Sequence, residues 1–269
     1  MKIFTLLLFT ITLLFSDVYY SKVEPYKIRK ISSNVSGLIT VVDEDMLGKI
    51  LSNKPYIKID NVLDIDELNA IKEKLFDSKQ ILLLDYKILK NINELLLKKR
   101  ENYKKIKNLK IKSIFEKNKE FYDLIASENL YLSTKKEINT LKIQISDLEL
   151  RKTQLIKNIN DKNLTAKGFV LYTLDVKVGQ FVNKSTPLAT LVDTSKAILT
   201  IYLNQDDALV AKNKTIYIND KKTSYKIDRL LNIADSKNIS KYMAQIIIKS
   251  PKLFSKLLKI ELRSDNNEK

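Results

Sequence analysis

The longest regular pattern in the chain is a repeat of apolar positions in steps of three and four residues. The 112 residues between Pro55 and Gly168 contain neither glycine nor proline, which argues against long loops. Steps averaging 3.5 residues are typical of a coiled-coil seam, so this stretch predicts two long helices packed against each other. The predicted seam positions are Leu75, Ser78, Leu82, Asp85, Leu89, Ile92, Leu96, Lys99, Tyr103 and Ile106, then Ile138, Leu141, Ile145, Leu148, Lys152, Leu155 and Ile159.

Capping residues predict where these helices meet. Ser113 and Glu116 have the spacing of a capping box at a helix N-terminus. Asn108, just upstream, suits a left-handed C-terminal cap. A turn at 108–113 would therefore join two helices of similar length, as an antiparallel hairpin requires.

The start of the first helix is predicted from Asp64 and Glu67, which also have capping-box spacing. The expected helices then cover 64–108 and 113–162, and each arm is on the order of 70 Å long at 1.5 Å per residue.

A competing turn is also present in the sequence. Thr134 and Glu137 make another capping pattern, after the polar stretch 127–134. A tip at this point would leave arms of very unequal length, so it ranks second to the turn at 108–113.

The segments before and after the helical stretch resemble each other. Each has two glycines eleven residues apart, then a proline seven or eight residues later, then an apolar strand that ends in aspartate. Neither half has enough strands to be stable alone, so we expect the halves to pair, with the hairpin inserted between them. The predicted turn residues are Gly37, Gly48 and Pro55 in the first half and Gly168, Gly179 and Pro187 in the second.

The C-terminal part of the chain is predicted to be all-β. Short apolar or alternating runs at 216–218, 225–227, 244–249 and 257–262 favour strands. The stretch 18–23 alternates weakly and could contribute a further strand. The last residues, 263–269, are polar.

The N-terminus has the features of a secretory signal peptide. A positive start, Met1-Lys2, precedes an apolar run at 3–15 that is too short to cross a bilayer comfortably. Cleavage after Ser16 would leave the mature chain outside the cytoplasm. The alternative is an uncleaved anchor whose span extends past Asp17 into Val18-Tyr19-Tyr20.

Composition excludes several kinds of chemistry. The 269 residues include no cysteine and no histidine, so disulfides, thiolate metal sites, cysteine nucleophiles and a Ser-His-Asp triad are all excluded. Only four glycines occur, and all belong to the repeat, which argues against a glycine-rich phosphate loop. The sequence therefore predicts no catalytic, cofactor-binding or metal-binding residues.

The order of these segments resembles the HlyD family of membrane fusion proteins, or periplasmic adaptors. The second half carries the better match, in Ala166-x-Gly168-x-Val170, Val178-Gly179, Pro187-Leu188 and Leu191-Val192-Asp193. The resemblance implies an α+β fold in which a long antiparallel hairpin is inserted between the halves of a lipoyl-like β-domain and is followed by a small β-barrel. The expected parts are a signal peptide (1–16), a first strand and half-domain (17–62), the hairpin (63–163), the second half-domain (164–195), the barrel-like domain (196–262) and the polar tail (263–269).

The resemblance also implies a function and partners. The chain would be a periplasmic adaptor, associated with the inner membrane, in a tripartite efflux or type I secretion system. It would join an inner-membrane transporter, either an ABC ATPase or a proton-driven pump, to a TolC-like outer-membrane channel, and would form a homo-oligomeric ring, most simply a hexamer. The hairpin occupies the place where carrier domains present a modifiable lysine, so no cofactor is expected.

The predicted hairpin tip is strongly basic. Between Lys98 and Lys119 there are ten Lys or Arg residues and two acidic residues, so this end could dock against an acidic partner or an anionic surface. The tip contact is predicted at Asn108, Leu109, Lys110, Ile111, Lys112 and Ser113. The net charge of +16 does not indicate nucleic-acid binding, because arginine is scarce and a signal peptide is predicted.

One tip motif of TolC-dependent adaptors is not met. In that motif an Arg is followed by Leu four residues later and by Ser seven residues after that, whereas Arg100 is followed by Lys104 and Ile111. Two other classes of function stay open: a coiled-coil envelope tether without a transport role, and an enzyme using paired carboxylates alone.

Overall fold

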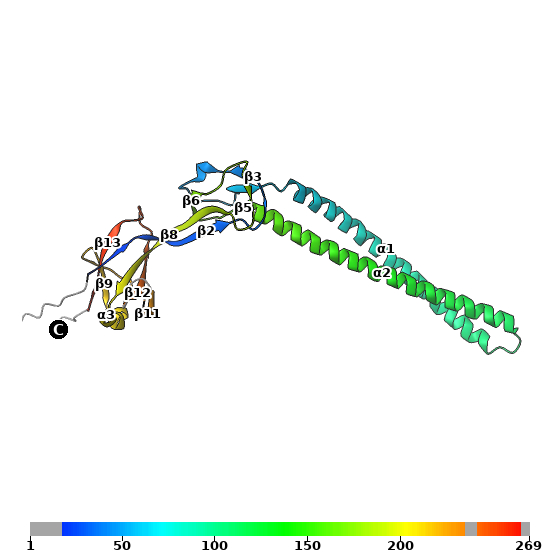
Figure 1. Ribbon diagram of the computed structural model, residues 1–269. Coiled ribbons are helices and arrows are strands. Elements are labelled where there is room, and N and C mark those ends of the chain that lie inside the picture. The colour runs from blue at the N-terminus through cyan, green and yellow to red at the C-terminus, as the bar shows by residue number, and fades with distance from the viewer. Residues whose placement is uncertain (1–17, 235–240, 265–269) are drawn as a thin grey trace, which may run out of the picture.

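The computed structural model describes residues 18–234 and 241–264, which form two β-domains and a long helical hairpin arranged in a row (Figure 1). The hairpin is inserted between strands of the middle domain, and the second β-domain lies at the opposite end. The predicted fold class is confirmed. The predicted signal peptide, 1–16, and residues 265–269 of the predicted tail lie outside the described residues.

The hairpin consists of α1 (Val62–Lys107) and α2 (Ile114–Lys162), which run antiparallel along their whole length (Figure 1). All seventeen predicted seam positions are buried or half-buried, whereas the large apolar side chains elsewhere on the helices are mostly exposed. Burial of this narrow stripe is what pairs the two arms.

Two predictions about the ends of the first helix are wrong. The helix begins at Val62, two residues before the predicted cap at Asp64, and the Val62 N–H donates to Asp60 Oδ1 (3.2 Å). Asp64 instead contacts the second helix. Asn108 ends α1 in a right-handed conformation (φ −96°, ψ −6°), not a left-handed one.

The competing turn at 127–134 is also wrong, because these residues lie inside the continuous α2. Ser127 and Thr134 are buried in the seam, and their hydroxyls donate to the carbonyls of Asp123 (2.9 Å) and Leu130 (3.0 Å) in the preceding turn. In the sequence these polar residues suggest a helix start, but in the structure their hydroxyls hydrogen-bond to the backbone inside a continuous helix.

The middle β-domain is built from both flanking segments, as the repeat predicted. Its four-stranded sheet has the order β5-β4-β3-β7. Two of its strands precede the hairpin and two follow it, and they enclose an apolar core that includes Ile39 and Leu171. The strands are β3 (Gly37–Val42), β4 (Ile57–Ile59), β5 (Asn163–Leu164) and β7 (Phe181–Val182).

The predicted turn residues of this domain have two different roles. Gly48, Gly168 and Gly179 lie in turns with φ of 73°, 85° and 83°, a left-handed conformation that favours glycine. The turn prediction is wrong for Gly37, which begins β3. A Cβ atom there would lie 2.6 Å from Ile59 Cγ2, so close packing is what requires the glycine.

The two prolines of the repeat also differ. Pro55 lies in the loop before β4, whereas Pro187 is not at a turn but begins β8 (Pro187–Leu203). The strand β8 runs through both β-domains, so the expected boundary at residue 195 falls inside it. It pairs with β2 (Glu24–Ser32), β6 (Val170–Leu174) and β12 (Tyr242–Lys249).

The second β-domain consists of two sheets around an apolar core that includes Leu199, Ile216, Ile246 and Ile260. One sheet has the order β11-β12-β8-β2, where β11 is Arg229–Ala234. The other has the order β1-β13-β9-β10. Its strands are β1 (Val18–Lys22), β13 (Leu257–Arg263), β9 (Thr215–Ile218) and β10 (Lys221–Lys222).

The structure of this domain agrees with one expectation from the sequence and differs from two others. The N-terminal strand is present, because β1 pairs with β13. The expected strand at 225–227 is absent, since these residues have no regular structure. The domain is not all-β, because α3 (Gln205–Val210) and a short 3-10 turn, Ala211–Asn213, follow β8.

Candidate functional site

The far end of the hairpin is a short, capped turn. The six predicted contact residues, 108–113, connect α1 to α2. The predicted capping box is present: the Glu116 N–H donates to Ser113 Oγ (3.2 Å), and the Ser113 N–H donates to Glu116 Oε2 (3.0 Å). Hydrogen bonds from Lys112 and then from Ser113 lower the pKa of Glu116 to about 2, so this carboxylate is ionised at neutral pH.

The tip exposes large apolar side chains. Ile111 is 91% exposed, Ile114 79%, Phe115 79% and Leu109 45%. Among the described residues only seven large apolar side chains are more than three-quarters exposed, and three of them lie in this run of five residues. The tip therefore differs from the rest of the described surface, where apolar side chains this exposed occur singly.

Two of these four side chains are missing from the contact predicted from sequence, which ended at Ser113. Ile114 and Phe115 lie in the first turn of α2. Counting back from Ile138 in heptads places both outside the seam, so their apolar character had no partner within the hairpin. Apolar residues outside the seam were therefore the sequence signal that could have added Ile114 and Phe115 to the predicted contact.

Basic residues are concentrated in the turn and in the last helical turns on either side of it. Of the ten basic residues between Lys98 and Lys119, Arg100 pairs with Glu128 (2.6 Å) and Lys112 with Glu116 (2.8 Å). Lys99 donates to the Asp123 carbonyl (3.3 Å). The other seven make no ion pair with any described residue and are free to attract an external negative charge: Lys98, Lys104, Lys105, Lys107, Lys110, Lys117 and Lys119.

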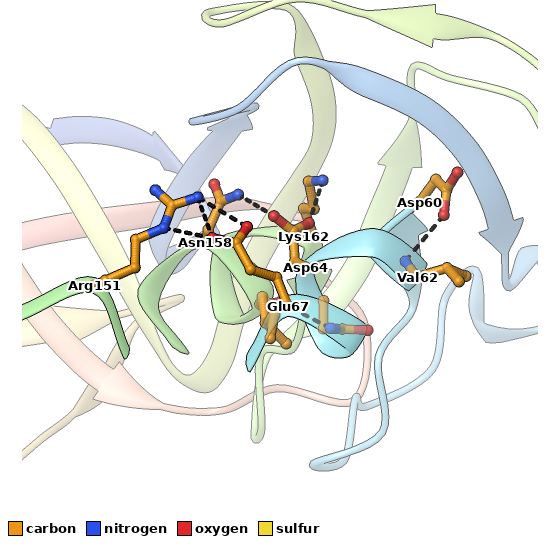
Figure 2. A network of polar contacts seen from close by, with 9 residues as sticks. Asp60, Val62, Asp64, Glu67, Arg151, Asn158 and Lys162 are labelled. Carbon is orange, nitrogen blue, oxygen red and sulfur yellow. Dashed lines mark hydrogen bonds and ion pairs between the residues drawn. The ribbon is translucent and has the colours of Figure 1, made fainter. Parts of the chain in front are cut away.

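At the opposite end, a polar network fixes the two helices where they leave the β-domain (Figure 2). Arg151 donates from Nε and Nη2 to the two carboxylate oxygens of Glu67 (2.7 and 2.8 Å). Asp64 accepts from Asn158 Nδ2 (2.7 Å) and pairs with Lys162. The hydrogen bond from Arg151 lowers the pKa of Glu67.

The Asp64–Lys162 pair differs from most other ion pairs of the hairpin in its burial. Its side chains are 14% and 15% exposed, whereas Lys79 and Glu149, further along the arms, are 54% and 40% exposed. A partly buried pair that also binds Asn158 has a defined geometry, so this network sets the position of α1 relative to α2 at the base of the hairpin.

Within residues 18–234 and 241–264, no group of three acidic side chains is placed to hold a metal ion. The helices of this same part of the chain are all too short or too polar to cross a membrane. The distinctive chemical feature is therefore the tip, where exposed apolar side chains and lysines occur together at the end of two arms.

Comparison with solved structures identifies the class of fold. The chain superposes on MacA from Actinobacillus actinomycetemcomitans with a TM-score of 0.65 and 20% identity, covering 92% of this chain and 78% of that one. It superposes on the membrane fusion protein Spr0693 from Streptococcus pneumoniae R6 with a TM-score of 0.57 and 11% identity, covering 93% and 100%.

A third similar structure is a chimera of MacA that contains the α-hairpin domain of MexA from Pseudomonas aeruginosa. Its TM-score is 0.57, with 16% identity over 92% of this chain and 81% of the chimera. The fold is thus that of HlyD-type membrane fusion proteins, as the sequence resemblance predicted. No family model and no curated protein sequence matches the chain.

Proposed function

We propose that this protein is the periplasmic adaptor of a tripartite efflux or type I secretion system. It would join an inner-membrane transporter, ABC or proton-driven, to a TolC-like outer-membrane channel. The observation that carries the proposal is the arrangement of the molecule, with two β-domains at one end and the hairpin tip at the other (Figure 1). The tip is basic and exposes four apolar side chains. The 46 residues of α1 separate the tip from the β-domains by on the order of 70 Å.

The predicted location follows from the same scheme. The β-domains would lie at the inner membrane beside the transporter, with the chain delivered to the periplasm by the signal peptide predicted at 1–16. The tip residues 108–113 would contact the channel. The work of export would be done by the transporter, and the adaptor would act by assembly.

The adaptor would act as several copies around a common axis. A conduit needs a closed wall, and a single arm cannot provide one, so a homo-oligomeric ring is the simplest arrangement. We propose a hexamer, by resemblance to HlyD-type adaptors. Mass photometry of the purified chain together with its transporter would measure the number of copies.

The second candidate is an envelope tether without a transport role. A tether would need only the hairpin and would have no use for the split β-domain. Deletion of the gene separates the two: the adaptor proposal predicts lost export with an intact envelope, whereas a tether predicts envelope leakage with export unchanged.

The direct test of the channel contact is photo-crosslinking in intact cells from residue 112, with the captured partner identified by mass spectrometry. The proposal predicts capture of an outer-membrane channel from residue 112 but not from residue 130, which lies well inside α2. Capture of only the protein itself or of inner-membrane lipid from residue 112 would contradict it.

A further inference from the structure

The composition of the tip determines what kind of surface it can bind. The hairpin ends in four exposed apolar side chains, Leu109, Ile111, Ile114 and Phe115 (the apolar cap). The same end of the hairpin carries the seven lysines without ion pairs described above, at 98–119 (the lysine collar). Removing aliphatic and aromatic side chains from water is favourable, so the cap is suited to a dry contact and the collar to a negatively charged rim.

The cap is held in a fixed shape before any partner binds. The capping box between Ser113 and Glu116 closes the first turn of α2, and Lys112 pairs with Glu116 across the same turn. Ile114 and Phe115 therefore project from an ordered helix end. A preorganised contact loses little conformational entropy on binding, which favours docking into a partner of matching shape.

The small apolar area of the tip argues against a lipid surface as the partner. The lysines would attract anionic head groups as well as an acidic protein, so charge does not decide between the two. Four apolar side chains form a small anchor, whereas stable membrane attachment generally needs a larger apolar area or a second signal. In a protein interface the four side chains would form the apolar centre and the lysines the polar rim.

We propose that the apolar cap inserts into an apolar hollow on the partner protein, and that acidic residues around the rim of that hollow attract the lysine collar. This inference rests on the proposed adaptor function and specifies the chemistry of the channel contact. It predicts a contact that depends mainly on the cap for its lifetime and on the collar for its rate of formation.

The test compares matched pairs of variants by photo-crosslinking from residue 112 in intact cells. Ile111→Ser with Phe115→Ser removes two of the four side chains of the cap, and Phe76→Ser, an exposed position near the base of α1, is its control. We expect the cap variant to capture the channel at least about tenfold less well than wild type, as for a hot spot, and the control to capture it normally. Circular dichroism would verify that each variant keeps its helices.

The collar is tested in the same way. Lys110→Glu with Lys117→Glu reverses two charges at the tip, and Lys72→Glu with Lys87→Glu reverses two exposed charges elsewhere on α1. For this comparison the light is applied to detergent-solubilised membranes instead of intact cells. The tip pair should reduce capture of the channel at about 50 mM salt by roughly threefold to tenfold, and the difference should shrink at about 500 mM salt because of screening. Equal capture with both pairs would contradict the role of the collar.

The outcomes separate this inference from the proposed function. If wild type captures a channel and the cap variant captures it equally well, the cap is not the contact, although the adaptor function stands. If wild type captures no outer-membrane protein, both fail. If the purified chain sediments with vesicles of phosphatidylglycerol and phosphatidylethanolamine, and the cap variant does not, the tip binds lipid and the inference is overturned.

Discussion

The base and the tip of the hairpin are built from the same heptad pattern but from different side chains. Near the base the seam is aliphatic, with Leu68, Ile71, Leu75 and Leu155 buried together against Ile145, Leu148 and Ile159. Toward the tip the seam contains Ser127, Thr134 and Lys99, and ends in the ring contact of Tyr103 with Phe121 (5.5 Å between centroids).

This difference separates stability from recognition. Apolar burial and a partly buried ion pair concentrate stabilising contacts where the arms leave the β-domain. The distal half has fewer buried apolar side chains in its seam, Leu96 among them, and exposes more at its end. We therefore expect opening of the hairpin to begin at the tip and to stop at the base.

The largest effect should come from the aliphatic base. Leu155→Ala removes a side chain that is 3% exposed and should destabilise the hairpin by about 2–5 kcal/mol, because the surrounding helices cannot close the cavity fully. Thermal unfolding followed by helical circular dichroism measures the loss. A cost below about 0.5 kcal/mol, no larger than that of the exposed Leu150→Ala control, would show that the base is not the stable half.

The polar network at the base should give the next largest effect. Asp64→Ala leaves Lys162 and Asn158 without their shared acceptor, at an expected cost of about 1–3 kcal/mol. Glu149→Ala removes the exposed partner of Lys79 instead and should cost less than about 1 kcal/mol. Denaturant unfolding measures the loss in the free energy of unfolding for both variants. Equal losses would mean that the partly buried network at the base stabilises the hairpin no more than an exposed ion pair does.

The distal seam should become more stable when it is made more like the base. Thr134→Val keeps the shape of a buried side chain and removes a hydroxyl that donates to the Leu130 carbonyl. We expect a gain of about 0.5–1 kcal/mol and slower hydrogen exchange in the distal turns of α2. Faster exchange would show that the hydroxyl stabilises this half of the hairpin.

The smallest effect concerns pH at the tip. The pKa of Glu116 is lowered from 4.5 to about 2 by its bonds to Lys112 and Ser113, so its contribution to helix capping is fully present above about pH 4.5 and is lost as pH falls toward 2. Titration by nuclear magnetic resonance should show Glu116 still ionised at pH 3.5. A midpoint near 4.5 would show that the capping box does not hold in solution.

Much of this architecture could be predicted from the sequence. The seam was visible because a period of 3.5 residues survives polar substitutions such as Ser78 and Lys99. The pairing of the two half-domains was visible because glycines and prolines repeat at matched spacings. The turn between the helices was marked by the Ser113–Glu116 capping box, which the structure contains.

The rest depended on long-range contacts that sequence spacing does not show. Asp64 and Glu67 have the spacing of a cap, but they bind Lys162 and Arg151, more than eighty residues away. Thr134 likewise suggests a helix start in the sequence, whereas in the structure it is a buried residue inside α2. Gly37 has ordinary backbone angles and is required by the approach of Ile59, which only the folded sheet brings close.

The proposed function requires the hairpin to act as an arm whose length and tip both affect export. Removing 81–94 from α1 and 129–142 from α2 deletes two heptads from each arm, keeps the seam in register, and retains the Lys79–Glu149 and Arg100–Glu128 pairs. The arm becomes about 21 Å shorter, with an unchanged tip. A control replaces the same residues with other heptads of equal length.

Export measured in cells carrying each variant tests the central claim most directly. The adaptor account predicts that the shortened protein is folded and present in the periplasm but does not support export, whereas the equal-length control does. Full export by the shortened protein would contradict the account, because an arm that must reach a partner cannot lose about a third of its length without consequence.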